Sequence, residues 1–424
     1  MIIKKRIGNF IYYLLKKLYY SFSFLFLLLL FIIQKFIFVR IGYLHRNRIG
    51  HLVGNTLIYL YKKKLIKKFY YNNNSFFQID VWIAQKKIIY PIIERLFNKK
   101  LIILPQYILL GVYNLASKFS YFKKFIIDEH DWGMDYFNLN YKSKVENLLN
   151  KKQIIFAENK LKEISIYPND KIACIINRNN FFNKNIIKDE KPIKLNNYRN
   201  SNFNDYLLAA KYLSKKGYKV IRMGSHDQNF KNKYVINYSS SRISDQLIDF
   251  FLLKKAQIIV SSGTGIDSIA AMLYKKKICY VNYSPYINIQ SIKFTPGCVF
   301  IMKKLLKNNK LLSLKEIIQD NYFTIQDSIT FKENGIKIIN NSKKEIFECV
   351  KEFYSLNFEH YKLSKKKLIL QKKFYKILNN VISLKKNYNL KLENYEKLKI
   401  AQKQKPLAYF SSYFLTKNPW FLKN

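Results

Sequence analysis

Small polar residues and glycines gather in one turn of this chain, and such a turn suits the binding of an anion. The turn is Ser261-Ser262-Gly263-Thr264-Gly265, and an apolar run over 257–260 precedes it. The pattern predicts a helix over 266–274 and a second buried strand over 277–281. Free backbone N–H groups at the start of a helix bind phosphates and other anions. The alternative is an ordinary strand-to-helix turn that binds no ligand.

Three arginines stand where a ligand of this turn would need positive charge. Arg178, Arg199 and Arg222 fall at or just beyond the carboxyl ends of predicted strands. Ligands of open parallel sheets bind at that edge. Lysine far outnumbers arginine in this chain, so arginine at all three positions favours a selected role. For any one of them, a surface ion pair is the alternative.

Alternating strands and helices are expected to position these residues. Apolar runs over 171–177, 218–224, 257–260 and 277–281 predict strands, and helical patterns separate them. Successive strand–helix–strand units of this kind predict a doubly wound parallel sheet. The helix over 203–216 is expected to end at Gly217, and a further strand is predicted over 298–305.

A second α/β unit precedes this one. A strand is predicted over 36–41, followed by a loop over 42–55 that holds three of the twelve glycines, and a helix from about 56 to 68. We expect the two units to cover 36–164 and 165–340, divided near the turn Tyr167-Pro168-Asn169-Asp170. Helices are predicted within 341–384. The basic tail, 385–424, is expected to be loosely ordered.

Residues 1–35 combine basic residues with an apolar run from Leu18 to Ile33. The run is a little short of the ~20 residues that span a bilayer. We therefore expect an interfacial or shallowly inserted anchor with its basic residues on the cytoplasmic side. A spanning helix and a buried core helix are the second and third alternatives.

The charge is strongly unbalanced: 75 Lys+Arg against 27 Asp+Glu give a net charge of +48. A nucleic-acid binder would concentrate these cations with aromatic residues in one patch. Here the lysines are scattered and no RNA- or DNA-binding motif is found. Compositional drift and an anionic membrane surface explain the charge better than a specific nucleic acid. The four widely spaced cysteines predict reduced core residues, and neither they nor the histidines have the spacing of a metal site.

Several of these segments, taken in order, resemble a poorly characterised bacterial glycosyltransferase family associated with surface-polysaccharide gene clusters. The resemblance covers roughly residues 36–310 and is densest over 198–265. The matching pieces are Arg48-Ile49-Gly50-His51-Leu52, Tyr198-Arg199-Asn200-Ser201, Tyr212-Leu213 with Gly217-Tyr218, Val220 through Gly224, Ser244-Asp245, Asp249 and Ser261 through Gly265. The sequence Asn177-Arg178-Asn179 departs from the pattern, because relatives tend to carry Arg followed by Asp there.

The resemblance implies a GT-B-like architecture of two Rossmann-like domains, with the acceptor domain first and the nucleotide-sugar donor domain second. It implies no cofactor and no metal beyond the nucleotide sugar itself. The residues that it assigns to the donor are Arg178, Arg199, Arg222, Gly224, Asp249, Ser261, Ser262, Gly263, Thr264 and Gly265. For Asp245 and Asp249 the expected contact is the ribose, with a helix cap as the alternative, and for Asp245 the cap is an equally good interpretation. Ser244 is the expected N-cap of that helix.

The resemblance also makes His51 the candidate general base that deprotonates the acceptor hydroxyl. A structural histidine at the start of the following helix is the alternative. Asp131, His130 and Asp135 are weaker candidates for the same role. Asp267 is expected to be an ordinary acid in the first turn of its helix.

The expected function is sugar transfer from a nucleotide-sugar donor to a polysaccharide or lipid-linked acceptor at the cytoplasmic face of the membrane. One alternative is a nucleotide-sugar epimerase or hydrolase of the same fold. The other is a non-enzymatic basic protein that binds membranes or nucleic acid, and it predicts steeply salt-dependent binding.

Overall fold

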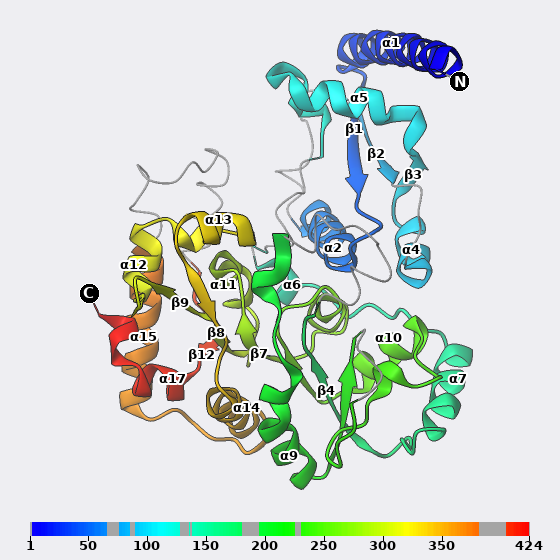
Figure 1. The fold of residues 1–424 in the computed structure, drawn as a ribbon. Coiled ribbons are helices and arrows are strands. Elements are labelled where there is room, and N and C mark those ends of the chain that lie inside the picture. Colours follow the sequence, from blue (N-terminus) through cyan, green and yellow to red (C-terminus); the bar gives the residue numbers. More distant parts are fainter. Residues whose placement is uncertain are drawn as a thin grey trace. The chain divides into compact units, whose positions relative to one another are not determined.

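A computed structural model describes residues 2–65, 76–84, 90–127, 135, 138–179, 195–224, 230–380 and 404–423 (Figure 1). The chain divides into two compact units, Met1–Gly133 and Met134–Asn424. Both are α/β units built on parallel sheets, as the sequence predicted. Each is described here by itself.

The first unit holds a three-stranded parallel sheet in the order β1-β2-β3. Its strands are β1 (Ile37–Leu44), β2 (Phe77–Ala84) and β3 (Ile102–Pro105), with Ile37 opposite Phe77. Its helices are α1 (Ile2–Ile33), α2 (Ile49–Leu65), α4 (Pro91–Asn98), α5 (Gln106–Lys118) and the short η1 (Ser120–Phe125).

Helices α2 and α5 cover opposite faces of this sheet. Side chains alternate between the two faces of a strand. Ile41, Val81 and Ile83 form a core with Leu109 and Val112 of α5. On the other face, Tyr59 of α2 packs edge-on against Trp82, with ring centroids 4.8 Å apart. The Tyr59 hydroxyl also donates to the buried Asp80 carboxylate, which accepts two hydrogen bonds from Arg40.

Helix α1 packs along α5. The backbone N–H of Gly111 donates to the Tyr19 hydroxyl at 2.7 Å, and Leu27 and Leu30 enter the core of the unit. A Cβ at Gly111 would lie 2.1 Å from Ser23 Oγ, so only glycine lets the two helices approach this closely. Within the described residues, Phe10–Ile33 is the one helical segment long and apolar enough to cross a membrane, and most of it is exposed.

The second unit is built on a six-stranded parallel sheet in the order β12-β8-β7-β6-β4-β5. The strands are β4 (Lys171–Ile176), β5 (Tyr218–Met223), β6 (Ile258–Ser261), β7 (Ile278–Tyr283), β8 (Val299–Met302) and β12 (Tyr409–Phe410). The strand order reverses at β4, which pairs with β5 on one side and β6 on the other. This doubly wound order creates a topological switch point between β4 and β6.

Helices cover both faces of the large sheet. Helix α9 (Leu207–Lys215) connects β4 with β5, and α10 (Gln246–Lys255) connects β5 with β6. These crossovers run in opposite directions across the sheet, so right-handed connections place their helices on opposite faces. The unit also contains α6 (Leu139–Lys142), α7 (Lys151–Lys162), η3 (Asn197–Arg199), α12 (Leu314–Gln319), α13 (Ser328–Glu333), α14 (Lys343–Phe358) and α15 (Lys365–Asn379). A small antiparallel sheet, β10-β9-β11 (Lys310–Leu311, Lys304–Lys307, Lys337–Ile339), is appended.

The division between the units falls earlier in the chain than the 164/165 boundary that the turn at Tyr167 suggested. Residues from Met134 on belong to the second unit. The Asn140 side chain donates to the Ala271 carbonyl at 3.1 Å, and Lys275 donates to the Ser143 hydroxyl at 2.7 Å. These long-range contacts tie the segment before α7 to the large sheet, and no local sequence signal announces them.

Two predicted boundaries shift for packing reasons. Strand β1 continues to Leu44 and α2 already begins at Ile49, so ten of the fourteen residues of the expected 42–55 loop are in regular structure. Buried Leu52, Val53 and Leu57 supply the tertiary contacts that outweigh the low helix propensity of Gly50 and Gly54. The run over 298–305 is not one strand, because it breaks at Lys303 between β8 and β9.

The C-terminal end of the tail is packed into the second unit, which corrects the expectation of loose order there. Strand β12 pairs with β8, and α17 (Ser412–Lys417) follows it. Phe410, Phe414 and Phe421 are buried against one another. Aromatic burial outweighs the polar composition of the segment. Residues 385–403 lie outside the described part of the chain.

Candidate anion-binding site

The loops after β4 and β6 are joined by hydrogen bonds at the switch point. The backbone N–H of Arg178 donates to Ser262 Oγ at 2.8 Å, and the N–H of Ser262 donates to the Ile176 carbonyl at 3.0 Å. The Arg178 carbonyl accepts from the N–H of Ser201. The Arg178 loop, the Ser262 turn and the segment after Arg199 therefore meet at one place, where ligands of open α/β sheets bind.

Three cationic side chains converge there. Arg199 donates through Nη2 to the Gly263 carbonyl. Lys303 is only 2% exposed, and its ammonium group donates to the carbonyls of Tyr198 (2.9 Å) and Asn200. Burial, followed by the charges of Arg199 and Arg178, lowers the pKa of Lys303 to about 7. Three cations that repel one another at a buried site favour a bound anion.

One carboxyl group, Asp267, lies beside this cluster and is committed to the turn itself. Its Oδ2 accepts from Ser261 Oγ at 2.6 Å and from the Thr264 N–H at 3.0 Å. Burial raises its pKa to about 6, against the opposing effects of Ser261, Arg199 and the Thr264 N–H. At pH 7 this carboxyl is still largely ionised, so it offsets about one of the positive charges and leaves the cluster with a net positive charge.

The Ser261–Gly265 turn uses more of its polar groups in internal hydrogen bonds than the sequence suggested. Gly263 has a φ of +79°, and its N–H donates to Ser261 Oγ at 3.1 Å. The following helix is short and ends in the π-helical turn η6 (Ile269–Leu273). Thr264 Oγ1 is buried and has no hydrogen-bond partner among the described residues. The side chains of Arg178, Arg199 and Thr264 thus lie at the cluster, while the Gly263 and Thr264 N–H groups are already bonded within the turn.

Arg222 lies in a different environment from the other two arginines. Its guanidinium is stacked between the rings of Phe203 and Phe230, 4.4 and 4.7 Å from their centroids. This gives it a packing role at the edge strand β5, and a contact with the donor stays a prediction. Gly224, at the end of that strand, has a φ of +100°, and the residues 225–229 that follow lie outside the described chain.

Asp249 lies in the first turn of α10, and the N-cap of that helix is Asp245 rather than Ser244. Asp245 accepts from the Leu247 N–H at 2.7 Å, so it takes the capping role. Burial raises the pKa of Asp249 to about 7, while a hydrogen bond with Tyr238 lowers it. A ribose contact for Asp249 stays a prediction.

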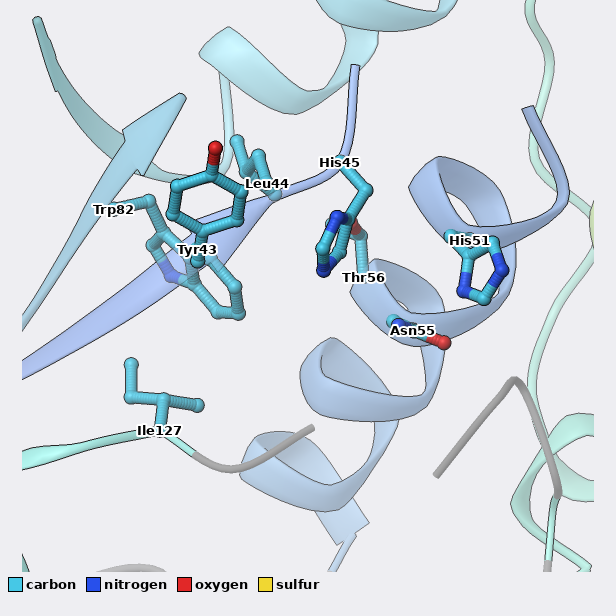
Figure 2. A pocket seen from close by; sticks show the side chains of 8 residues that line it. All are labelled: Tyr43, Leu44, His45, His51, Asn55, Thr56, Trp82 and Ile127. Carbon is cyan, nitrogen blue, oxygen red and sulfur yellow. The ribbon is translucent and has the colours of Figure 1, made fainter. Parts of the chain in front are cut away.

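His51 lines a pocket in the first unit (Figure 2). Its ring lies 5.8 Å from that of His45, measured between centroids, and Figure 2 shows both rings beside Asn55 and Thr56. Asn55 Oδ1 and Thr56 Oγ1 are buried and lack a partner among the described residues. His51 sits in the first turn of α2, so the general-base and structural roles both stay predictions. Its partner His45 was missed in the sequence, although it lies only six residues away.

Of the three weaker candidates for the general base, only Asp135 lies within the described residues. The Asp135 carboxylate accepts from the N–H groups of Leu139 (2.8 Å) and Asn140 (2.6 Å), so it caps α6. His130 and Asp131 lie outside the described residues.

No protein-family model matches the chain, and a search of curated proteins found no match. Among solved structures, the chain is similar to the ADP-heptose lipopolysaccharide heptosyltransferase II of E. coli, with 12% identity over 64% of this chain and 92% of that one, at a TM-score of 0.36. A family 9 glycosyltransferase from Veillonella parvula is 10% identical over 59% of this chain and 83% of that one, at a TM-score of 0.32. The UDP-GlcNAc 2-epimerase from Neisseria meningitidis is 13% identical over 75% of this chain and 100% of that one, at a TM-score of 0.30. At such TM-scores these likenesses carry no functional argument.

Proposed function

We propose that this protein is a glycosyltransferase that binds the diphosphate of a nucleotide-sugar donor at the Arg178–Arg199–Lys303 cluster. The observation that carries the proposal is the convergence of these three cations at the switch point of a doubly wound sheet. The Asp267 carboxyl group beside Arg199 accepts hydrogen bonds within its own turn and can offset only one of these charges. A doubly charged diphosphate has the charge that this arrangement lacks.

The chemistry of sugar transfer explains why such a cluster would matter. As the bond between the sugar and the diphosphate breaks, negative charge grows on the departing nucleoside diphosphate. Guanidinium groups held in place before the reaction stabilise that charge without reorganising. Arg199 is held by the Gly263 carbonyl and the Arg178 backbone by Ser262, so both loops are fixed in position.

The acceptor side of the proposal rests on the sequence resemblance. It implies a polysaccharide or lipid-linked acceptor and makes His51 the base that removes the proton of the acceptor hydroxyl. The basic N-terminal segment favours an acceptor at the cytoplasmic face of the membrane. Replacing His51 by Ala is expected to abolish transfer while leaving donor binding unchanged. Replacing His45 in the same way tests whether the neighbouring ring supports that role.

A thermal-shift screen against nucleoside diphosphates and their sugars tests the donor assignment. A ligand that binds only the folded protein raises the melting temperature, and at a hundred times its Kd it stabilises by about 2.7 kcal/mol. We expect one nucleotide to stabilise the wild type and to lose its effect in Arg199→Ala. Stabilisation by none of them would refute the assignment.

The same preparations separate a transferase from an epimerase or hydrolase. An epimerase or hydrolase turns over its nucleotide sugar without any acceptor. A transferase releases nucleoside diphosphate at a substantial rate only when a membrane extract containing acceptor is added. Full turnover of the donor alone would establish the alternative function.

A further inference from the structure

Helix α1 exposes a continuous apolar stripe. Seven residues recur at alternating spacings of four and three, which places them on one side of an α-helix. Their exposure ranges from 48% at Leu29 to 72% at Ile32. The stripe consists of Ile11, Leu15, Leu18, Phe22, Leu25, Leu29 and Ile32. A continuous exposed stripe of seven large apolar side chains is typical of an interaction surface and not of ordinary protein surface.

The opposite side of α1 is held by the first unit. Tyr19 and Ser23 pack against α5 at Gly111, and Leu27 and Leu30 are buried in the core. Figure 1 shows α1 lying alongside α5. The apolar stripe therefore faces away from the unit, and α1 cannot leave α5 without breaking these contacts.

Neighbouring elements continue the exposed surface. In α5, Tyr107 is 72% exposed and precedes Gly111 by one helical turn, so it lies on the side of α5 that carries α1. In η1, Tyr121 is 63% exposed, and its ring lies 5.2 Å from that of Phe31 of α1. The Lys124 ammonium stands 4.8 Å from the Phe31 ring. Aromatic rings interleaved with lysine are typical of the boundary between lipid and water.

The positive charge of this surface favours an anionic partner. Residues 1–79 contain no Asp or Glu, and neither do α5 and η1. The basic residues of the three elements are Lys4, Lys5, Arg6, Lys16, Lys17, Lys118, Lys123 and Lys124. A second copy of the chain would bring like charges together beside the stripe, whereas anionic phospholipid head groups would attract them.

We propose that α1, α5 and η1 together dock this protein on an anionic lipid bilayer, with α1 lying in the plane of the membrane. A spanning α1 is inconsistent with its packing. Residues 19–30 contact the first unit, and the remaining part of the helix, 2–18, is shorter than the ~20 residues that cross a bilayer and carries five cations. The proposal does not depend on the enzymatic activity.

Co-sedimentation with vesicles tests the docking surface. We expect binding to vesicles of equal parts phosphatidylcholine and phosphatidylglycerol, and at least about tenfold weaker binding to phosphatidylcholine alone. The double substitution Phe22→Glu/Leu29→Glu should reduce binding to the anionic vesicles by about tenfold or more. Tyr107→Glu should also weaken it, because α5 belongs to the surface. Ile369→Glu, at a 64% exposed site on α15, is the matched control and should bind as the wild type does.

Labelling of a single cysteine distinguishes in-plane from spanning geometry. The four native cysteines are buried, so a cysteine added before Met1 reacts alone. In inside-out vesicles from producing cells, a membrane-impermeant maleimide should label it as readily as a cysteine replacing the exposed Lys171. Labelling only after detergent would show that α1 spans the membrane. Unchanged vesicle binding in the Phe22→Glu/Leu29→Glu and Tyr107→Glu variants, or a soluble dimer that these variants dissociate, would also overturn the proposal.

Discussion

At the scale of single residues, the site depends on groups whose surroundings give them unusual properties. Lys303 is the clearest case, since a lysine normally keeps its charge far above neutral pH. Its burial beside two arginines lowers its pKa to about 7. It was not singled out in the sequence, because the Lys-Lys pair at 303–304 looks like the many other lysine pairs of this chain.

The lowered pKa of Lys303 predicts pH-dependent donor binding. The folded protein loses the ammonium charge as pH rises through about 7, so the attraction for an anion falls in the same window. The diphosphate of a nucleotide sugar does not titrate there. We expect affinity to fall by up to about tenfold per pH unit above 7. Calorimetric titrations at several pH values measure this slope.

Lys303→Met removes the titrating group and should flatten that dependence, whereas Asp267 titrates lower, near pH 6, in both proteins. An equal slope in wild type and variant would contradict the role of Lys303. The stability of the protein without ligand should change in the opposite direction. The unfolded chain binds the Lys303 proton more tightly than the folded protein does, so the free energy of unfolding should rise as pH increases above about 7.

Gly263 offers a second test at this scale. A Cβ there would lie 2.4 Å from the Tyr283 ring, whereas at Gly217, which has a similar φ of +84°, no atom lies within 4 Å. Both substitutions to Ala carry the cost of a left-handed backbone, about 1 kcal/mol, and only Gly263→Ala adds the steric clash. Chemical denaturation should therefore show a larger loss for Gly263→Ala. Equal losses would show that Tyr283 moves aside freely.

At the scale of elements, the sequence predicted what local patterns encode. The strand–turn–helix units of 171–281 are visible as apolar periodicity, and Gly217 does end the helical segment with a positive φ. The features that the sequence did not predict depend on contacts between residues far apart in the chain. The early start of α2 depends on tertiary burial, and β12 depends on a partner strand about a hundred residues earlier.

The C-terminal strand predicts a stability effect that a loose tail would not show. Phe410 is fully buried, with its ring 4.5 Å from that of Phe374 and 5.2 Å from that of Phe300. Phe410→Ala is expected to lower the free energy of unfolding by about 3–5 kcal/mol. Ile369→Ala, at an exposed position of α15, should change it by less than about 1 kcal/mol. Urea denaturation compares the two variants, and a loss at Phe410 as small as that at Ile369 would mean that the tail is not part of the folded core.

At the scale of the whole molecule, the two units divide the proposed tasks. The second contains the cationic cluster, and the first contains the His45–His51 pocket and the surface proposed to meet lipid. The candidate site was predictable in part, since Arg178 and Ser262 do come together as their strand ends implied. Arg199 reaches the same place from η3 and not, as the sequence had predicted, from the end of a strand. The stacking of Arg222 between Phe203 and Phe230 was not predictable, because Phe203 comes from a short 3-10 helix and Phe230 from a loop.

Direct binding of a nucleoside diphosphate tests the central claim most directly. Isothermal titration should give a measurable Kd for the wild type, weakened at least about tenfold in Arg178→Ala and in Arg199→Ala, since each loses a charged hydrogen bond to phosphate. Lys171→Ala removes an exposed charge from the opposite end of the same strand, β4, and should bind as the wild type does. Wild-type affinity in both arginine variants, or no binding of any nucleoside diphosphate by the folded protein, would contradict a donor site at the switch point.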